Sequence, residues 1–412
     1  MIGGEPRTVR AGMLRLAVVV VGGMAGLAAV YALSAWVVRL WPGGEALRYP
    51  WEAMRAFLFG GDDPYRRLAL LYGWSQRDGF AVAPQPYPFP MALALFAPLA
   101  LLKDFAAART WAMWGAVLAL VAAVALVARS LRWRPGGSGA VALGAFALTG
   151  YFAVVALLRA DVVVLVLLLL MIALAALLDG RDDLAGIALT FTLIKPGLSL
   201  YPTLFLLLWA ASRRRWRLWR GFWGSTAVLL VLAFWLLPSW GLEMAFLLLR
   251  FKAAASPRLA LAHAVPGVGR QVGWLLVAVV AVAVLAEWAA SWGQSVYQAA
   301  WTTALTVVGA LLVGGRVVPA DQVLLLLPLL WVWAYWSSRW KTYGRPAAAL
   351  TLAVFWVLPW LFWGGRLFSA SGVCASVGMC FFEPLVVWVL LYTVRWWAAR
   401  APAAFSSEAL LE

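Results

Sequence analysis

Histidine and cysteine are nearly absent from this chain of 412 residues, which has one histidine, His263, and two cysteines, Cys374 and Cys380. So few ligands exclude a structural metal site of the His/Cys type, and one histidine leaves no plausible Ser-His-Asp catalytic set. No glycine-rich loop ends in Lys-Ser or Lys-Thr, which excludes a phosphate-binding loop of that kind. We therefore expect no metal and no resident cofactor. A disulfide between the two cysteines and two free thiols both remain open.

Charged residues are also scarce, since they make up 12% of the chain while 65% of the residues are hydrophobic. A soluble domain has about 25% charged and about 45–50% apolar residues, so a water-soluble enzyme is excluded. Apolar runs recur from Val18 to Val394, and about 20 apolar residues suffice to cross a bilayer. We expect an all-α polytopic membrane protein in which residues 1–412 form one integral-membrane domain of about twelve transmembrane helices.

The net charge of +16 is carried at the ends of the apolar runs, as the positive-inside rule predicts. We therefore expect the lipid bilayer, and not nucleic acid, as the basic residues' partner. Arginines before the first run place the N-terminus in the cytoplasm of a multi-pass plasma-membrane protein, and an even span count places the C-terminus there too. Basic loops at 213–220 and 339–345 then lie inside, and loops at 41–87, 241–270 and 365–383 lie outside.

Two topologies remain open for the early spans. If every apolar run crosses the membrane, Arg129, Arg132 and Arg134 lie outside, against the positive-inside rule. If 91–102 is re-entrant and 184–211 is split into two short helices around Lys195-Pro196, these arginines lie inside and the later topology is unchanged. We favour the second topology.

Several charged residues lie at or near membrane depth, where charge is costly and is a functional candidate by default. Lys195 lies within a long apolar stretch, so it must find an anion or reach water; a functional cation is favoured over a structural ion pair. Arg159 and Asp161 flank the junction of two spans and could pair with each other. Asp321 follows Pro319 at the start of another span and is interpreted as a helix N-cap.

The first outer loop, 41–87, is the longest polar stretch in the first half of the chain. It carries five acids and five arginines, and segments 51–59 and 66–74 are expected as short helices on the membrane surface. A carboxylate there could act as general base toward a sugar or lipid hydroxyl, although a solvated side chain is the favoured interpretation for any single one of them. The adjacent acids Asp62-Asp63 and Asp182-Asp183 are interpreted as turn residues, with a divalent-ion site as the alternative.

A second outer loop, 241–270, is basic although it lies outside. It contains Glu243 against four cations: Arg250, Lys252, Arg258 and Arg270. Such a loop suits an anionic ligand such as a lipid phosphate, and contact with lipid headgroups is the equal alternative.

Several short motifs occur in a recognisable order. The first outer loop contains Glu45-Ala-Leu-Arg-Tyr49, Glu52-Ala-Met-Arg and Gly61-Asp-Asp-Pro-Tyr65. Further motifs are Tyr87-Pro-Phe-Pro90, the stretch from Ala185-Gly to Lys195-Pro196, and Val318-Pro-Ala-Asp-Gln322. Over roughly residues 11–340, this order resembles the polytopic glycosyltransferases of family 87 in the GT-C superfamily, which are mannosyltransferase-like membrane enzymes of the cell envelope.

Four positions depart from the family pattern. Glu45 stands where the family usually has Asp, and Tyr87-Pro88-Phe89 replaces Tyr-Pro-Pro. Asp161 stands where Gln is more common, and the late span lacks the usual His. These changes are compatible with the reaction class and leave the sugar open.

The resemblance implies a GT-C-like bundle that transfers a hexose such as mannose from a polyprenyl-phosphate donor to a glycolipid or glycan hydroxyl outside the membrane, with inversion. It implies Glu45 as catalytic base. The expected substrate-binding residues are Tyr49, Glu52, Asp62, Asp63, Tyr87, Arg159, Asp161, Lys195, Arg250, Lys252, Arg258, His263 and Arg270. Lys195 and the cations of 241–270 would neutralise the departing lipid phosphate. Two alternatives stay open: a non-catalytic carrier or flippase of lipid-linked sugars, and a secondary transporter.

Overall fold

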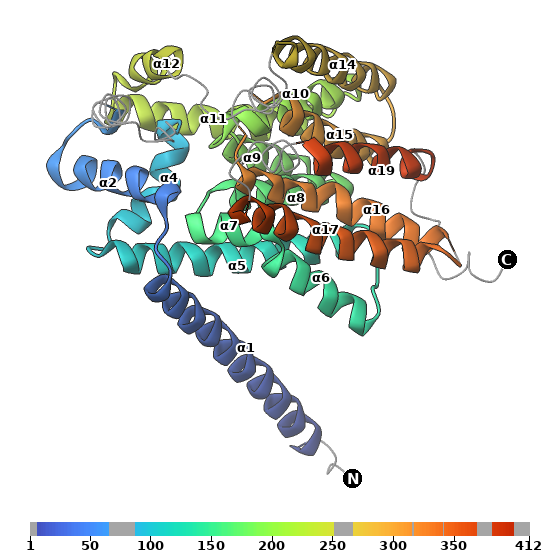
Figure 1. Cartoon of the computed structure of the whole chain (residues 1–412). Helices are drawn as coiled ribbons and strands as arrows, with labels where there is room; N and C mark the ends of the chain where they lie inside the picture. The colour runs from blue at the N-terminus through green and yellow to red at the C-terminus, as the bar shows by residue number, and fades with distance from the viewer. Residues whose placement is uncertain are drawn as a thin grey trace.

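The computed structural model describes residues 6–65, 87–250, 267–314, 317–340, 342–368 and 381–398. Over these residues the chain is helical and contains no strand, which confirms the all-α expectation (Figure 1). The helices up to residue 178 are α1 (Pro6–Leu40), α2 (Glu45–Gly60), α4 (Phe89–Ala100), α5 (Phe105–Ser130), α6 (Gly137–Thr149), α7 (Tyr151–Arg159) and α8 (Val163–Leu178). The later ones are α9 (Asp182–Thr192), α10 (Pro196–Ser212), α11 (Trp216–Leu236), α12 (Trp240–Arg250), α14 (Gly269–Ala290), α15 (Val296–Val313), the 3-10 helix η1 (Pro319–Leu325), α16 (Leu326–Arg339), α17 (Gly344–Phe368) and α19 (Glu383–Ala398).

Within the described part of the chain, six helices are long and apolar enough to cross a membrane: α1, α5, α11, α14, α15 and α17. A seventh span results if α6 and α7, which bend by 47° at their junction, are taken together. The expected count of about twelve is therefore not confirmed. Several apolar runs that read as single spans are divided into shorter helices, and α8 has only 16 residues.

The stretch 184–211 is split into two helices, as the favoured topology requires. α9 ends at Thr192 and α10 starts at Pro196, whose fixed φ and missing N–H suit the first position of a helix. Asp182 at the start of α9 forms an ion pair of 2.6 Å with Arg215, just beyond the end of α10. The two helices therefore form a hairpin, and Lys195 lies at its tip.

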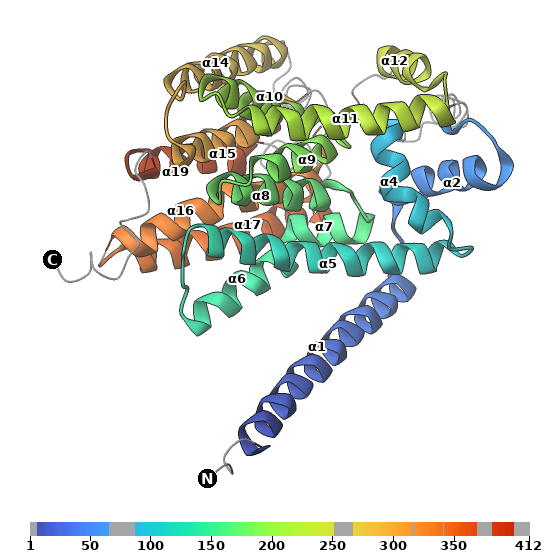
Figure 2. The same ribbon diagram turned by 180° about the vertical axis from the view of Figure 1, so that it is seen from behind.

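α4 is too short to cross a bilayer. Its 12 residues span about 18 Å, against a hydrocarbon core of about 30 Å. The end of α4 is bound by α2, because Trp51 Nε1 donates to the Leu99 carbonyl at 2.9 Å and Arg55 Nη1 donates to the Ala100 carbonyl at 2.9 Å. Figures 1 and 2 show α2, α4 and α12 grouped at one end of the molecule, opposite the C-terminus.

α1 projects from the body of the molecule and contacts it mainly through α5 (Figures 1 and 2). Trp114 Nε1 donates to the Leu27 carbonyl at 3.1 Å, and Arg109 Nη1 donates to the Trp41 carbonyl at 2.7 Å. The residue at the end of α1 contacts the earlier residue of α5, and the residue in the middle of α1 contacts the later residue of α5. The two helices are therefore antiparallel. The end of α1 and the start of α5 thus lie together, next to α2.

Helices α9 and α11 pack at very short range through glycine. A Cβ atom at Gly186 would lie 2.2 Å from the Leu218 carbonyl oxygen, and one at Gly221 would lie 2.3 Å from the Asp183 carbonyl oxygen. Across the same interface Thr190 Oγ1 donates to the Phe222 carbonyl at 3.0 Å. Small residues and hydroxyl groups are the usual means of close helix packing in a bilayer. This packing supports the hairpin that carries Lys195.

Candidate functional site

Three charged side chains meet in the interior at Lys195. Its Nζ donates to Asp161 Oδ1 at 2.9 Å and also to Asp321 Oδ1. The exposed fractions of Lys195, Asp161 and Asp321 are 3%, 6% and 1%. Lys195 therefore forms a buried ion pair with two carboxylates, and we refer to these three residues as the ionic cluster.

Each member of the ionic cluster lies at a break between helices. Asp161 follows Ala160, which has a left-handed φ of 51°, and its Oδ1 accepts from the Val163 amide at 3.0 Å at the start of α8. Asp321 lies in the first turn of η1, where its Oδ2 accepts from the Val318 amide at 2.9 Å. Helix ends leave backbone N–H groups unpaired, so an aspartate there both caps a helix and faces Lys195. Contrary to the expectation, Asp321 is not the N-cap of η1. Val318 is the N-cap, and Asp321 is the third residue of the helix, where it accepts from the Val318 amide and also binds Lys195.

The expected pairing of Arg159 with Asp161 is replaced by the pairing of Asp161 with Lys195. Arg159 is half-buried, interacts electrostatically with Asp161, and has no hydrogen-bond partner at its buried Nε. Two aspartates and one lysine carry a formal charge of −1, and Arg159 brings the group to neutrality. An arginine with unused donors next to a buried ionic cluster is suited to bind an anion.

Tyr87 approaches the ionic cluster from the start of α4. It is 6% exposed and lies within electrostatic range of Lys195. Its backbone carbonyl accepts a hydrogen bond of 2.9 Å from the Tyr65 hydroxyl, and its ring packs on Phe96 at 5.4 Å. Burial raises the pKa of the Tyr65 phenol, so this group remains a donor. The motifs around Tyr65, Tyr87 and Lys195 are thus brought together in space.

The turn before Glu45 is attached to the helix that leads to Asp161. The Gly44 amide donates to the Leu158 carbonyl at 2.9 Å, three residues before Asp161. Gly44 has φ of 83° and lies against the side chain of Arg109, whose Nη2 also donates to the Leu158 carbonyl at 3.0 Å. Glu45 is exposed at the first position of α2 and interacts electrostatically with Arg109. The outer-loop carboxylate is therefore placed close to the α7–α8 junction.

The other acids of segment 41–87 occupy different surroundings. Glu52 pairs with Arg48 at 3.3 Å and lines, with Asp62, an open hollow of about 380 Å³ on the outside of α2. Asp63 accepts from the Tyr65 amide at 2.7 Å, and its Oδ2 accepts from Ser239 at 3.3 Å. Tyr49 packs half-buried against the core. Of these acids, Glu45 alone follows the turn that is bound to α7.

Most of the expected outer-loop cations fall outside the described residues. These are Lys252, Arg258 and His263, together with the side chain of Arg250, and the two cysteines lie outside them as well. Arg270 is described and is exposed near the start of α14. The expected helix at 66–74 also lies outside the described residues, whereas the helix expected at 51–59 is part of α2.

The adjacent acids Asp182 and Asp183 lie in the first turn of α9 and pair with arginines. Asp182 is buried, whereas the Asp183 side chain is 45% exposed, so the expected solvated side chain is found at Asp183 only. Asp182 pairs with Arg215, and Asp183 accepts three hydrogen bonds from Arg220, one from Nε at 3.1 Å and two from Nη2 at 2.9 and 3.1 Å. Within the described ranges no group of three His, Cys, Asp or Glu side chains is placed to hold a metal ion.

Sequence reasoning missed two buried charged residues that shape this region. Arg109 is 4% exposed and donates hydrogen bonds to both the Trp41 and Leu158 carbonyls. Its charge within an apolar stretch is the sequence feature that could have identified it. Glu383 is 1% exposed at the start of α19, and nothing in the local sequence distinguishes it from an ordinary helix-start acid.

The helical fold, the apolar spans and the ionic cluster define a polytopic membrane protein with a built polar site. The chain belongs to glycosyltransferase family 87, because the sequence model of that family matches residues 86–318, more than half of the chain. No curated protein and no solved structure matches the sequence. The matched segment includes Tyr87, Asp161 and Lys195, and Glu45 lies before it.

Proposed function

We propose that this membrane glycosyltransferase moves a hexose, such as mannose, from a polyprenyl-phosphate donor to a lipid- or glycan-linked hydroxyl. In this proposal the reaction takes place at the outer face of the plasma membrane and inverts the anomeric centre. The membrane bilayer, the lipid-linked sugar and the glycan acceptor are its partners, and no metal or cofactor takes part.

One observation carries the proposal. Tyr87, Asp161 and Lys195 lie far apart in the segment matched by the family, yet they converge beside the turn that precedes Glu45. A surface carboxylate can take a proton from a hydroxyl, and charged groups beside it can bind an anionic leaving group. A lipid-linked donor reaches such a site from the bilayer, and a polar acceptor reaches it from water.

The chemistry needs one carboxylate. Glu45 takes the proton from the acceptor hydroxyl while that oxygen forms a bond to the anomeric carbon. The bond between the anomeric carbon and the phosphate oxygen breaks, and its electron pair leaves on the polyprenyl phosphate. Because phosphate is a good leaving group, no general acid is required, in contrast to the two carboxylates of a glycosidase.

The departing phosphate needs cations. Two of the three ammonium hydrogens of Lys195 bind Asp161 and Asp321, so we assign Lys195 mainly the positioning of these aspartates. Arg159, with its unused Nε, is the described cation best suited to bind the phosphate. Arg270 and the cations of 241–270 add positive charge around a lipid headgroup.

The experiment is a transfer assay in nanodiscs with radiolabelled polyprenyl-phosphate mannose or glucose and a membrane-lipid extract. Wild type is expected to move label from the donor to a new product. Glu45→Gln is expected to lower the rate by about 10²–10⁴-fold, as for loss of a general base. Asp179→Asn is the control, because Asp179 is an exposed carboxylate at the C-terminal end of α8, at the opposite end of this helix from Asp161. Arg159→Gln is expected to raise the donor KM by at least about tenfold, since hydrogen bonds to charged groups contribute about 1.5–3 kcal/mol.

The outcomes separate the enzyme from the alternatives. Full transfer by Glu45→Gln would remove the base assignment. Donor binding without transfer, for every sugar and acceptor tested, would favour the carrier, and movement of the donor across liposomes would then be measured.

A further inference from the structure

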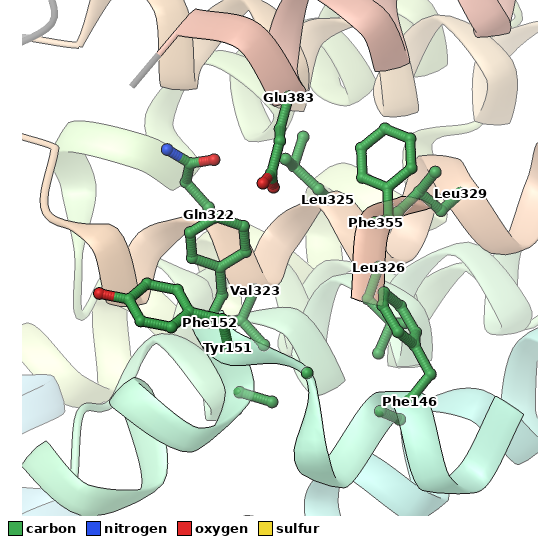
Figure 3. Close-up of a pocket in the computed structure, with 13 residues that line it drawn as sticks. Phe146, Tyr151, Phe152, Gln322, Val323, Leu325, Leu326, Leu329, Phe355 and Glu383 are labelled. Carbon is green, nitrogen blue, oxygen red and sulfur yellow. The ribbon is translucent and has the colours of Figure 1, made fainter. Parts of the chain in front are cut away.

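Glu383, the first residue of α19, is a buried acid without a partner among the described residues. It is 1% exposed, and its Oε1 accepts no hydrogen bond. Figure 3 shows its carboxyl group pointing into a cavity, on the same side as the amide of Gln322. A buried polar group without a hydrogen bond is costly, so a native protein that keeps one calls for an explanation.

The cavity beside Glu383 is small and mainly apolar. Its volume of about 30 Å³ has room for roughly two water-sized groups. The lining comes from α6, α7, η1, α16, α17 and α19, and its rings are those of Phe146, Tyr151, Phe152 and Phe355. An apolar pocket with one or two placed polar groups is the usual form of a site that recognises a small uncharged ligand group.

The chemistry of Glu383 favours a hydroxyl as that group. No ion pair to Glu383 occurs among the described residues, and a lone carboxylate at such depth is expensive, so the neutral acid is favoured. A neutral carboxylic acid offers one donor and one acceptor, which matches the donor and acceptor of a hydroxyl. Two acids close together would instead favour a cation, and the described lining contains Glu383 as its one acid.

The cavity adjoins the ionic cluster through η1. Gln322, which lines the cavity, directly follows Asp321, which binds Lys195. Glu383 and the ionic cluster therefore contact the same short 3-10 helix.

We propose that this cavity binds the hydroxymethyl group of a hexose substrate, with the Glu383 carboxyl group hydrogen-bonded to its hydroxyl. The inference rests on the proposed function and adds a specificity site to it. A hydroxymethyl group has two heavy atoms and stands out from the ring, so it fills a space of two water-sized groups while the ring stays outside. The hexose is either the transferred sugar or the terminal sugar of the acceptor, and both present the same group.

The test compares ligands with and without this hydroxyl, in phosphatidylcholine nanodiscs free of sugar detergents. Farnesyl-phosphate mannose and its 6-deoxy analogue represent the donor, and hexyl mannoside and its 6-deoxy analogue represent the acceptor. Wild type is expected to bind at least one parent compound about tenfold more tightly than its 6-deoxy analogue, as for the loss of one well-placed hydrogen bond. The pair that shows the preference identifies the source of the sugar.

Two variants tie the preference to Glu383. Glu383→Leu is expected to remove the preference, whereas Glu383→Gln, which still donates and accepts, keeps most of it. Glu383→Leu is also expected to raise the Tm of the free protein, because an unsatisfied buried polar group is replaced by an apolar one. A purely structural role predicts the reverse: a lower Tm, with the preference unchanged.

The proposal is overturned if wild type shows no preference in either pair, or if Glu383→Leu leaves the preference intact. These are binding measurements and do not require transfer. Preference without any transfer would therefore contradict the proposed function alone, and transfer without preference would contradict this inference alone.

Discussion

The Lys195 ammonium group donates a hydrogen bond of 2.9 Å to Asp161, a residue 34 positions earlier in the chain. This bond joins the tip of the α9–α10 hairpin to the junction of α7 and α8, and the contact with Asp321 adds η1. Each of these three helix breaks carries a charged side chain that would be unfavourable alone in a bilayer, and the three side chains pair with one another. The site is built where regular helical structure is interrupted.

Removal of the cation should destabilise the fold. Lys195→Met leaves Asp161 and Asp321 buried without a counter-ion, and breaking such a group is expected to cost about 3–5 kcal/mol. Thermal unfolding in nanodiscs measures the loss. Lys103→Met, at an exposed position between α4 and α5, should leave Tm unchanged. Addition of Asp161→Asn and Asp321→Asn to Lys195→Met should recover part of the lost stability, because the uncompensated charges are removed. An unchanged Tm in Lys195→Met alone would contradict a stabilising role of the ionic cluster.

The turn before Glu45 should not accept a side chain. In Gly44→Ala the new Cβ would lie 2.8 Å from Arg109 Cδ, at a residue with φ of 83°. Gly180→Ala is the matched control, because Gly180 has φ of 73° and open space around its Cβ position. Both variants carry the left-handed penalty of about 1–2 kcal/mol, and Gly44→Ala alone should also displace Glu45 and lower transfer. Equal transfer rates in the two variants would refute this positioning.

Close packing of α9 on α11 should be sensitive to one methyl group. In Gly186→Ala the Cβ would lie 2.2 Å from the Leu218 carbonyl oxygen, so the helices must separate, at a cost of about 1–3 kcal/mol. Gly224→Ala on α11, with open space around its Cβ position, should instead stabilise the helix by about 0.5–1 kcal/mol. The two Tm values should therefore move in opposite directions.

Tyr65 should make stability depend on pH in the alkaline range. Burial raises the pKa of its phenol above the unfolded value of about 10. Above that pH the unfolded chain releases a proton that folded Tyr65 keeps, so stability falls as pH rises. Wild type should lose more Tm between about pH 8 and pH 11 than Tyr65→Phe does. Parallel losses in both proteins would show that Tyr65 titrates normally.

Features set by local composition were predictable from the sequence. Apolar runs identify the helices, and Pro196 marks the break at Lys195, because proline cannot continue a helix from the preceding turn. A lysine within an apolar run is a candidate for a buried partner whatever the fold, since its charge must be compensated. The motifs around Tyr87 and Lys195 lie within the segment that the family matches.

Features set by long-range packing required the tertiary structure. Arg159 lies next to Asp161 in sequence, yet Lys195 is the ion-pair partner, because the hairpin brings its tip to the α7–α8 junction. The number of full spans depends on how apolar runs bend and divide, which hydrophobicity alone does not encode. Glu383 reads as an exposed helix-start acid, and its burial arises only when α19 packs against α15, α16 and η1. Sequence determines which residues are costly in a bilayer, and tertiary packing decides which groups satisfy them.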